Sequence, residues 1–239
     1  MLQFIHPPTI PELLESFIHL WYPELCVACQ HDMPAQSSCF CLPCSLKLMP
    51  FSFHEPSNNS FTARLWGRVP MLWGLAAYHF NRRSPIQKAL HQLKYHNSPD
   101  IGMKLGRQMG ARLLAEKELI LPDVLIPVPL HPRKERLRGY NQSAEFATGL
   151  AEVLDIPVIK NVLIRNKYTQ TQTKKKRMER FQNVGDVFAL NKTHLIEGKH
   201  LLLVDDVLTT GATLELCGNT LLRVDGVTLS MATIAIADL

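Results

Sequence analysis

The chain has 239 residues, 46% of them hydrophobic, which is enough to bury a substantial core in one domain or two. Its 26 basic and 21 acidic residues give a net charge of +5, a balance that suits phosphorylated ligands or nucleic acid but requires neither. No apolar stretch approaches the roughly 18 residues of a membrane-spanning helix. Residues 1–23 contain no Lys or Arg and so lack the basic start of a secretory signal. We therefore expect a cytoplasmic protein with no membrane span.

Five of the six cysteines lie between Cys26 and Cys44, and in a cytoplasmic protein such a cluster favours a metal site over disulfides. Two CxxC pairs separated by eleven residues can each present two thiolates from a tight turn, which together complete a tetrahedral Zn²⁺ site. Cys39 is an alternative ligand in place of Cys41, and His31 is a weaker candidate. A redox CxxC would need a βαβ context that this proline-rich region does not offer. The predicted structural zinc ligands are Cys26, Cys29, Cys41 and Cys44.

Short elements are predicted around and after this cysteine module. Residues 10–20 are expected to form a short helix with one apolar face, and the stretch 51–70 a linker that is polar at its start. An apolar, aromatic strand is expected over 71–80. Ser84 and the proline after it predict the start of a helix over 85–95.

From residue 101 onward, helical and strand patterns alternate. The helix expected over 101–117 carries Gly102, Gly106 and Gly110 on one face, which favours close packing in a soluble fold. Strands alternating with helices predict an α/β fold with a parallel sheet flanked by helices. The later elements are strands over 124–128, 158–164, 200–204 and 226–237, and helices over 141–154 and 214–223.

The most informative feature is an apolar run over 201–204 that ends in two adjacent aspartates and opens into a loop of small and hydroxyl residues. Open α/β sheets bind ligands at the carboxyl ends of their strands. Backbone N–H groups near Gly211 and the start of the next helix can hold a phosphate, whereas the two carboxylates can accept hydrogen bonds from sugar hydroxyls or bind Mg²⁺. A ligand that carries a diol and a phosphate and binds with a metal ion matches a ribose 5-phosphate. The predicted site residues are Asp205, Asp206, Thr209, Thr210, Gly211, Ala212 and Thr213.

Three other interpretations of this run are weaker. A P-loop NTPase requires the G-x-x-x-x-G-K-[ST] pattern, but Gly198-Lys199 is followed by His200 and lacks the first glycine. A receiver-type acidic pocket would carry its paired acids early in a domain, whereas these lie near the end of the chain. An ordinary buried strand and turn would leave two adjacent carboxylates without a ligand or partner, which is energetically costly.

Four basic side chains follow the predicted strand 124–128. They would form a cationic rim at the sheet edge that also carries the acid pair, which suits a pyrophosphate; a solvated basic loop is the simpler alternative. Gly139 would allow a turn, and Asn141 would cap the next helix. The candidate pyrophosphate ligands are Arg133, Lys134, Arg136 and Arg138.

A long polar stretch over 167–180 carries a second group of basic residues. Its low apolar content predicts mobility, and insertions of this kind often act as lids over a site. The basic residues could close over pyrophosphate or contact a nucleic-acid backbone. They are Lys174, Lys175, Lys176, Arg177 and Arg180.

Together these motifs resemble those of the ComF family, in its ComFC/GntX group, which is linked to DNA uptake in bacterial competence. The resemblance extends over nearly the whole chain from Cys26 onward, and the combination is far more specific than any one motif. The matching motifs are the two CxxC pairs and the segments 93–95, 136–142, 169–184, 188 and 205–213.

The chain departs from the family pattern at three positions. Asn97 stands where members usually have Gly, although Asn also tolerates a left-handed backbone. Lys175 stands where they usually have Leu, which makes the basic stretch more basic, and Cys39 is additional. None of these positions belongs to the predicted ribose-phosphate site.

The resemblance implies a type I phosphoribosyltransferase-like fold with a small N-terminal four-cysteine zinc module, and a site for 5-phosphoribosyl-1-pyrophosphate (PRPP) with Mg²⁺. The expected organisation is an N-terminal helix and zinc-finger-like module over 1–50, a linker over 51–70 and the phosphoribosyltransferase-like domain over 71–239. The expected function is PRPP binding in DNA uptake or processing, with Mg²⁺-dependent transfer of a phosphoribosyl group to an unidentified acceptor. The alternative is a non-catalytic protein of the same fold that binds single-stranded DNA or acts as an adaptor for a helicase-like partner.

Overall fold

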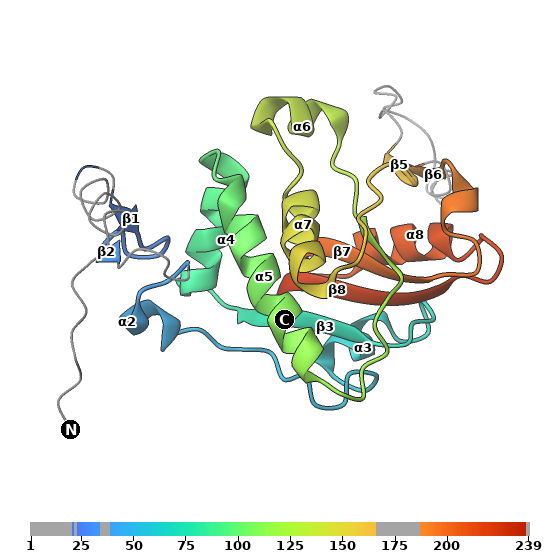
Figure 1. Cartoon of the computed structure of the whole chain (residues 1–239), viewed down its shortest axis with the longest axis horizontal. Coiled ribbons are helices and arrows are strands. Elements are labelled where there is room, and N and C mark those ends of the chain that lie inside the picture. Colours follow the sequence, from blue (N-terminus) through green and yellow to red (C-terminus); the bar gives the residue numbers. More distant parts are fainter. Residues whose placement is uncertain (1–20, 22, 34–38, 166–186, 238–239) are drawn as a thin grey trace, which may run out of the picture.

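The computed structural model describes residues 21, 23–33, 39–165 and 187–237 (Figure 1). The predicted helix over 10–20 and the basic residues of the 167–180 stretch lie outside the described residues. The strands are β1 (Glu24–Leu25), β2 (Asp32–Met33), β3 (Gly74–Phe80), β4 (Val124–Pro127), β5 (Leu163–Arg165), β6 (Phe188–Leu190), β7 (His200–Leu208) and β8 (Thr228–Ala237). The helices are α2 (Leu42–Ser45), α3 (Ser60–Leu65), α4 (Pro85–Tyr95), α5 (Pro99–Ala115), α6 (Pro132–Arg138), α7 (Gln142–Leu154) and α8 (Ala212–Leu221), with a 3₁₀ turn η2 (Thr193–Leu195).

The strands β3, β8, β7 and β4 form one sheet in that order, and each neighbouring pair is parallel. Strands β4, β7 and β8 are largely apolar and buried, as expected for a parallel sheet covered on both faces. Residues 157–159 extend the sheet beyond β4, because the Leu125 N–H donates to the Pro157 carbonyl oxygen at 2.9 Å and the Ile159 N–H donates to the Leu125 carbonyl oxygen at 3.0 Å. The predicted parallel sheet with flanking helices is confirmed.

This strand order places a topological switch point between β4 and β7. The connections from β3 to β4 and from β4 to residues 157–159 run toward one edge of the sheet, whereas the connection from β7 to β8 runs toward the other. Because parallel crossovers are right-handed, α4, α5 and α7 cover one face and α8 covers the other, where Gly218 lies against Met231 and Leu229. The carboxyl ends of the strands at such a switch point open a crevice for a ligand.

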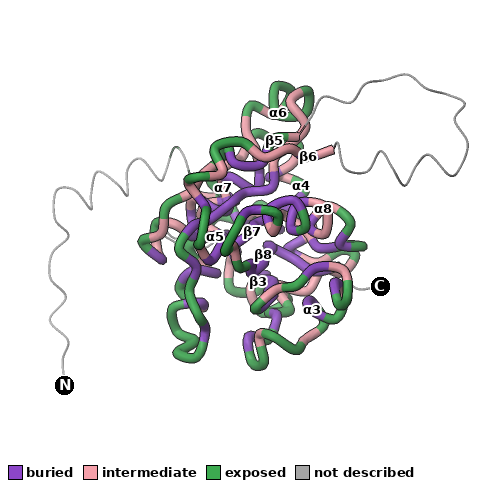
Figure 2. The backbone as a smooth tube through the Cα atoms, turned by 90° about the vertical axis from the view of Figure 1, so that its right-hand side faces the viewer, coloured by how far each residue is buried: buried purple, intermediate pink, exposed green. Residues whose placement is uncertain are grey.

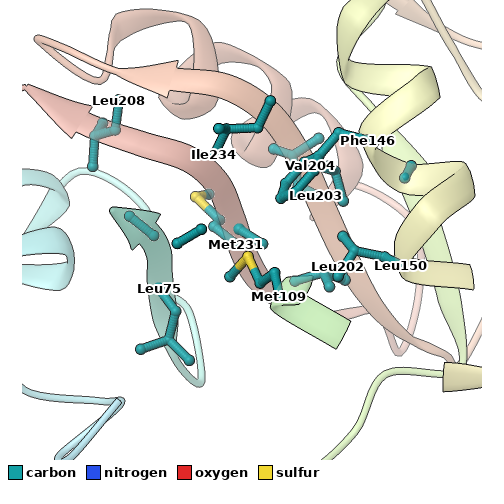
Figure 3. Packing of buried hydrophobic residues seen from close by; sticks show 14 of the residues in the cluster. Leu75, Met109, Phe146, Leu150, Leu202, Leu203, Val204, Leu208, Met231 and Ile234 are labelled. Carbon is teal, nitrogen blue, oxygen red and sulfur yellow. The ribbon is translucent and has the colours of Figure 1, made fainter. Parts of the chain in front are cut away.

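Helices α5 and α7 pack so closely that their backbones touch. A Cβ atom added at Gly106 would overlap the Phe146 carbonyl group, and one added at Gly149 would overlap the Met103 backbone. The predicted close packing along the glycine face of α5 is confirmed. Figure 3 shows Phe146 directed from α7 into the buried cluster around β7, and Figure 2 shows burial concentrated in the sheet and the helices on it. Within the described residues no helix, α5 included, is long and apolar enough to cross a membrane.

The basic stretch after β4, expected to be a loop, forms the helix α6. The His131 ring Nδ1 accepts a hydrogen bond from the Arg133 N–H at 3.2 Å, and a proline occupies the first helical position. Gly139 ends the helix with φ +82°, as the predicted turn requires. The Asn141 side chain caps α7 as predicted, accepting from the Ser143 N–H at 3.1 Å. Helix α6 therefore orders side chains that a loop would leave loosely placed.

The strand expected over 158–164 is divided. Residues 157–159 lie on the main sheet, a turn at residues 160–161 redirects the chain, and β5 then pairs antiparallel with β6 in a separate two-stranded unit. The periodicity of an apolar run cannot reveal this turn. The change of direction matters for the site, because β5 ends at Arg165.

The segment 51–70, expected to be a linker, packs onto the body of the protein. Phe51, Phe53 and Phe61 are buried, and the segment contains α3. Asn59 caps α3, since its side chain accepts hydrogen bonds from the backbone N–H groups of Phe61 and Thr62. The polar residues between the aromatic ones serve capping and turns, so their polarity does not indicate a free linker. The domain boundaries at 50 and 71 stay a prediction.

His200, at the start of β7, is a buried neutral base. A carbonyl oxygen can only accept, so His200 donates through Nδ1–H to the Leu121 carbonyl oxygen at 3.1 Å. Its Nε2 then accepts from the Ser230 hydroxyl at 2.8 Å. Burial lowers the pKa of His200 below the ordinary value of 6.5.

We expect this histidine to destabilise the fold in acid. Below about pH 6.5 the unfolded chain binds a proton that the native state does not, so the free energy of unfolding falls as the pH approaches the lowered pKa of His200. The substitution His200→Gln removes the titrating ring and, with it, this contribution to the pH dependence of stability. Urea unfolding at about pH 8 and about pH 5 should therefore show a smaller loss of stability in the variant. Equal losses in the two proteins would contradict the assignment.

Candidate functional site

A crevice of about 280 Å³ lies at the switch point, between the carboxyl ends of β4 and β7. Its walls come from the end of α4, the segment from β4 through α6, the start of α7, the end of β5 and the turn from β7 into α8. Segments far apart in the sequence thus meet at one edge of the sheet. The charged residues that line the crevice are Lys94, Lys134, Arg138, Arg165, Asp205 and Asp206.

Asp205 is held in place by two hydrogen bonds. Its Oδ1 accepts from the Ser143 hydroxyl at 2.9 Å and from the Asp206 N–H at 2.9 Å. Burial, and then the neighbouring charge of Asp206, raise the pKa of Asp205 to about 7. The carboxylate form is therefore costly in the free protein, and hydroxyl donors or a cation in the crevice would stabilise it.

Asp206 faces a cation from another part of the chain. Its Oδ2 lies 2.8 Å from the Lys94 Nζ, and these side chains are 19% and 27% exposed, so the pair remains accessible from the crevice. The Tyr140 hydroxyl donates to the Leu93 carbonyl oxygen at 2.5 Å and so fixes the end of α4 that carries Lys94. Sequence reasoning placed Lys94 in a family motif without a role, because its distance from Asp206 depends on the tertiary fold.

The turn from β7 into α8 has the form expected of an anion-binding loop. Gly211 is the N-cap of α8 and adopts φ +81°, a left-handed conformation that favours glycine. The N–H groups of the first turn of α8 have no acceptor within the helix, and the helix dipole adds positive potential there. Thr213 lines the crevice, whereas Thr209, Thr210 and Ala212 are exposed and, like the buried Gly211, are not among its lining residues.

Of the four predicted pyrophosphate ligands on α6, two face the crevice and two do not, because residues of a helix point to different sides. Lys134 and Arg138 are one turn apart on α6, and both line the crevice. Arg133 and Arg136 are exposed on other sides of the helix and do not line it. The guanidinium carbon of Arg138 also lies 5.3 Å from the centroid of the Tyr95 ring, at the mouth of the crevice.

Two further lining residues were missed by sequence reasoning. Gln142 is 1% exposed, and its Nε2 has no hydrogen-bond partner among the described residues. A buried amide donor without an acceptor is costly, and a ligand oxygen in the crevice would satisfy it. Arg165 brings a cation from the end of β5. One indication of this position was present in the sequence, because Arg165 directly follows the strand predicted over 158–164.

The two CxxC pairs meet as predicted, and their four sulfur atoms all lie within 4.8 Å of one another. A tetrahedral Zn²⁺ with Zn–S bonds of about 2.3 Å needs sulfurs about 3.8 Å apart, so the cluster fits this ion. The Cys41 N–H donates to the Cys26 Sγ at 3.4 Å, and the backbone N–H of His31 is the main cause that lowers the pKa of Cys29 to about 6. Both effects favour thiolates as metal ligands. The clustered residues are Cys26, Cys29, Cys41 and Cys44.

Cys39 and His31 lie outside the cluster found in the described residues. Burial raises the pKa of Cys39 to about 12, which keeps it a neutral thiol. Its backbone carbonyl oxygen instead supports the module by accepting from the Val27 N–H at 3.0 Å. The module is attached to α4, where the Lys88 Nζ donates to the Ala28 carbonyl oxygen at 2.8 Å.

Two cysteine substitutions should have opposite effects on metal content. We expect Cys44→Ser to lose most of the about one equivalent of zinc per chain, since three thiolates leave the tetrahedral set incomplete. The matched control, Cys39→Ala, should retain it. Elemental analysis of the dialysed proteins measures both. Loss of zinc from the Cys39→Ala protein would show that the ligand set is assigned incorrectly.

Because the carboxyl group of Asp205 is buried, we expect its replacement to raise the free energy of unfolding. Between pH 3.8, its ordinary pKa, and about pH 7, Asp205 holds a proton in the native state that it has lost in the unfolded chain, so stability decreases as the pH rises. The free energy of unfolding of Asp205→Asn should therefore exceed that of the native chain by an amount that grows from pH 4 to pH 7, to the order of 1–3 kcal/mol.

Denaturant titrations across this pH range provide the measurement. The exposed Asp225 supplies a control, because Asp225→Asn makes the same charge change away from the crevice. A stability difference for Asp205→Asn that is independent of pH would contradict the raised pKa.

The chain is similar in sequence to several known proteins. A family described as Phosphoribosyl transferase domain matches residues 141–238, from the cap of α7 through β8. Competence protein ComFC of Bacillus subtilis (strain 168) is 38% identical over 205 residues, which are 84% of this chain and 78% of that protein. Competence protein F of Haemophilus influenzae is 29% identical over 199 residues, which are 80% and 87% of the two chains.

DNA utilization protein YhgH of Escherichia coli (strain K12) is 32% identical over 142 residues, and the match spans 58% of this chain and 62% of that protein. Among solved structures, adenine phosphoribosyltransferase from Leishmania donovani aligns over 78% of this chain and 75% of its own, with 18% identity and a TM-score of 0.36. The extent and identity of the ComFC match decide the assignment. The chain belongs to the ComF family, and its sheet and matched domain have the type I phosphoribosyltransferase fold.

Proposed function

We propose that the crevice at the switch point binds PRPP or a related ribose 5-phosphate. The observation that carries the proposal is the meeting of an acid pair, the N-terminal end of α8 and four cationic side chains around one opening. A phosphate needs N–H donors and positive potential, a ribose diol needs acceptors, and a pyrophosphate needs cations. The match to a phosphoribosyl transferase domain supports the same ligand class.

Each part of PRPP has a complementary group in the proposal. The loop from Thr209 to Thr213 holds the 5-phosphate, and Asp205 and Asp206 accept hydrogen bonds from the ribose hydroxyls. The pyrophosphate lies toward α6 and the start of α7, where the Gln142 Nε2, which has no partner in the described part of the chain, can donate to it. The side chains assigned to the pyrophosphate are Lys134, Arg138, Gln142 and Arg165.

The acid pair also fits Mg²⁺, provided that the ligand completes its coordination. In phosphate sites Mg²⁺ is held by one or two carboxylates, water and substrate phosphates, and this chain offers the carboxylates. Asp206 would hold the ion in place of the Lys94 ammonium, with which its carboxylate pairs in the free protein. When bound, Mg²⁺ would neutralise the charge of the pyrophosphate.

A transfer reaction would use the same arrangement. The bond from the anomeric carbon to the pyrophosphate oxygen breaks while an acceptor nucleophile forms its bond to that carbon, and the electron pair leaves with pyrophosphate. Lys134, Arg138 and Arg165 would stabilise the charge on the departing group. Release of pyrophosphate in the presence of a panel of acceptors tests this step separately from binding.

Single-stranded DNA is the second candidate ligand, on the same cationic surface. Tyr95 is 66% exposed at the mouth of the crevice beside Arg138, and an exposed ring next to cations suits a stacked base and its phosphate. The names of the relatives, a DNA utilization protein and two competence proteins, are consistent with this use. The basic residues from Lys174 to Arg180, which lie outside the described residues, are further candidates for contact with a nucleic-acid backbone, and the zinc module could bind a helicase-like partner. If both ligands use the crevice, PRPP competes with the oligonucleotide.

Titration calorimetry with PRPP and Mg²⁺ tests the proposal. We expect saturable binding by the native chain and a loss of affinity of at least about tenfold in Asp206→Asn, because an amide cannot replace the carboxylate charge. Gln142→Met should also weaken binding while leaving the stability of the free protein unchanged or higher, since it removes a buried donor that has no acceptor among the described residues.

The charge-matched control is Asp225→Asn, which should bind as the native chain does. Absence of binding by the native chain, or native affinity in Asp206→Asn, would refute the proposal. Binding of a single-stranded oligonucleotide that PRPP does not displace would place the DNA site elsewhere.

A further inference from the structure

The loop from Thr209 to Thr213, proposed above to hold the 5-phosphate and called the phosphate loop below, rests on α3, a part of the chain that the sequence did not connect with the site. Arg64, near the end of α3, donates through Nη1 to the Thr209 carbonyl oxygen at 3.0 Å and more weakly to the Leu208 carbonyl oxygen at 3.4 Å. The same nitrogen lies 2.6 Å from the Ala237 carbonyl oxygen at the end of β8. One guanidinium thus ties the ends of β7 and β8 to the loop between β7 and α8.

A second arginine also holds a carbonyl group of the loop. Arg68 donates through Nη1 to the Thr210 carbonyl oxygen at 2.8 Å. Its Nε lies 3.0 Å from the Glu215 Oε2, and Nη2 of the same guanidinium also pairs with that oxygen, so Arg68 joins the loop to the first turn of α8. Leu65, between the two arginines, packs so closely beneath Gly211 that a Cβ atom there would meet its Cδ2 at 2.6 Å.

Because the peptide bond is planar, contacts that hold the carbonyl groups of the loop also fix the directions of the neighbouring N–H groups. In a trans peptide the carbonyl of one residue and the N–H of the next point in opposite directions. When the carbonyls of Leu208, Thr209 and Thr210 point toward the arginines, the N–H groups of the next residues point away from them. Donors directed to the side opposite the arginines are what a phosphate site requires.

We propose that Arg64 and Arg68 are positioning residues of the phosphate loop, which hold its carbonyls from behind so that its N–H groups face the 5-phosphate. This inference rests on the proposed function, because it assigns a phosphate to the loop. It gives residues 51–70 a role in binding without contact to the ligand. The charge of Arg64 also lies behind the donors and favours an anion in front of them.

The test combines hydrogen exchange with two ligand probes. In the double variant Arg64→Gln/Arg68→Gln, amide exchange of peptides covering residues 208–214 should accelerate, while exchange in the buried sheet strands stays native. Affinity for ribose 5-phosphate should fall about tenfold, because the donors are no longer preorganised. Affinity for pyrophosphate should stay native, because its proposed ligands lie on α6, α7 and β5.

The matched control is Arg107→Gln, which removes an Arg–Glu ion pair between α5 and α7, away from the loop. It should change neither the loop exchange nor the affinity for either probe. Native exchange in the loop of the double variant, or native affinity for ribose 5-phosphate, would overturn the inference. A native chain that binds neither ribose 5-phosphate nor PRPP would instead refute the proposed function, and the inference with it.

Discussion

The structure depends on one unfavourable placement, the carboxyl group of Asp205 at the end of an otherwise apolar, buried strand. The Ser143 hydroxyl, the Asp206 N–H and the nearby Lys94 offset part of the cost, but its pKa is still raised to about 7. A fold selected only for stability would use a neutral side chain here. A ligand that supplies hydroxyl donors and a cation would resolve the conflict, and relief of the cost of the buried carboxylate would then favour binding.

The segments before the matched domain support this site from two directions. Helix α4 carries Lys94 to Asp206, and the cysteine module is attached to that helix through Lys88. On the other side, Arg64 and Arg68 hold the carbonyl groups of the loop between β7 and α8. The N-terminal half of the described chain thus provides much of the geometry around residues that come from the C-terminal half.

Sequence patterns predicted the features that local chemistry determines. The apolar run of β7, the two CxxC pairs and the capping residues Ser84 and Asn141 each carry a strong local signal, and the structure agrees with them. Features that depend on tertiary contacts were missed or misjudged. The division of the 158–164 strand and the packing of residues 51–70 follow from contacts with distant segments, as does the burial of the Gln142 Nε2 without a partner in the described part of the chain. Helix α6 was also missed, although its signals are local: His131 as a cap, a proline at the first helical position and Gly139 at the end.

A crystal structure of the protein with ribose 5-phosphate and Mg²⁺ tests the central claim most directly. We expect the phosphate within hydrogen-bonding distance of the N–H groups between Thr210 and Thr213. We also expect the ribose hydroxyls to lie on the carboxylates of Asp205 and Asp206. A sugar phosphate bound elsewhere, with Asp205 still directed only to Ser143 and Asp206 only to Lys94, would contradict it.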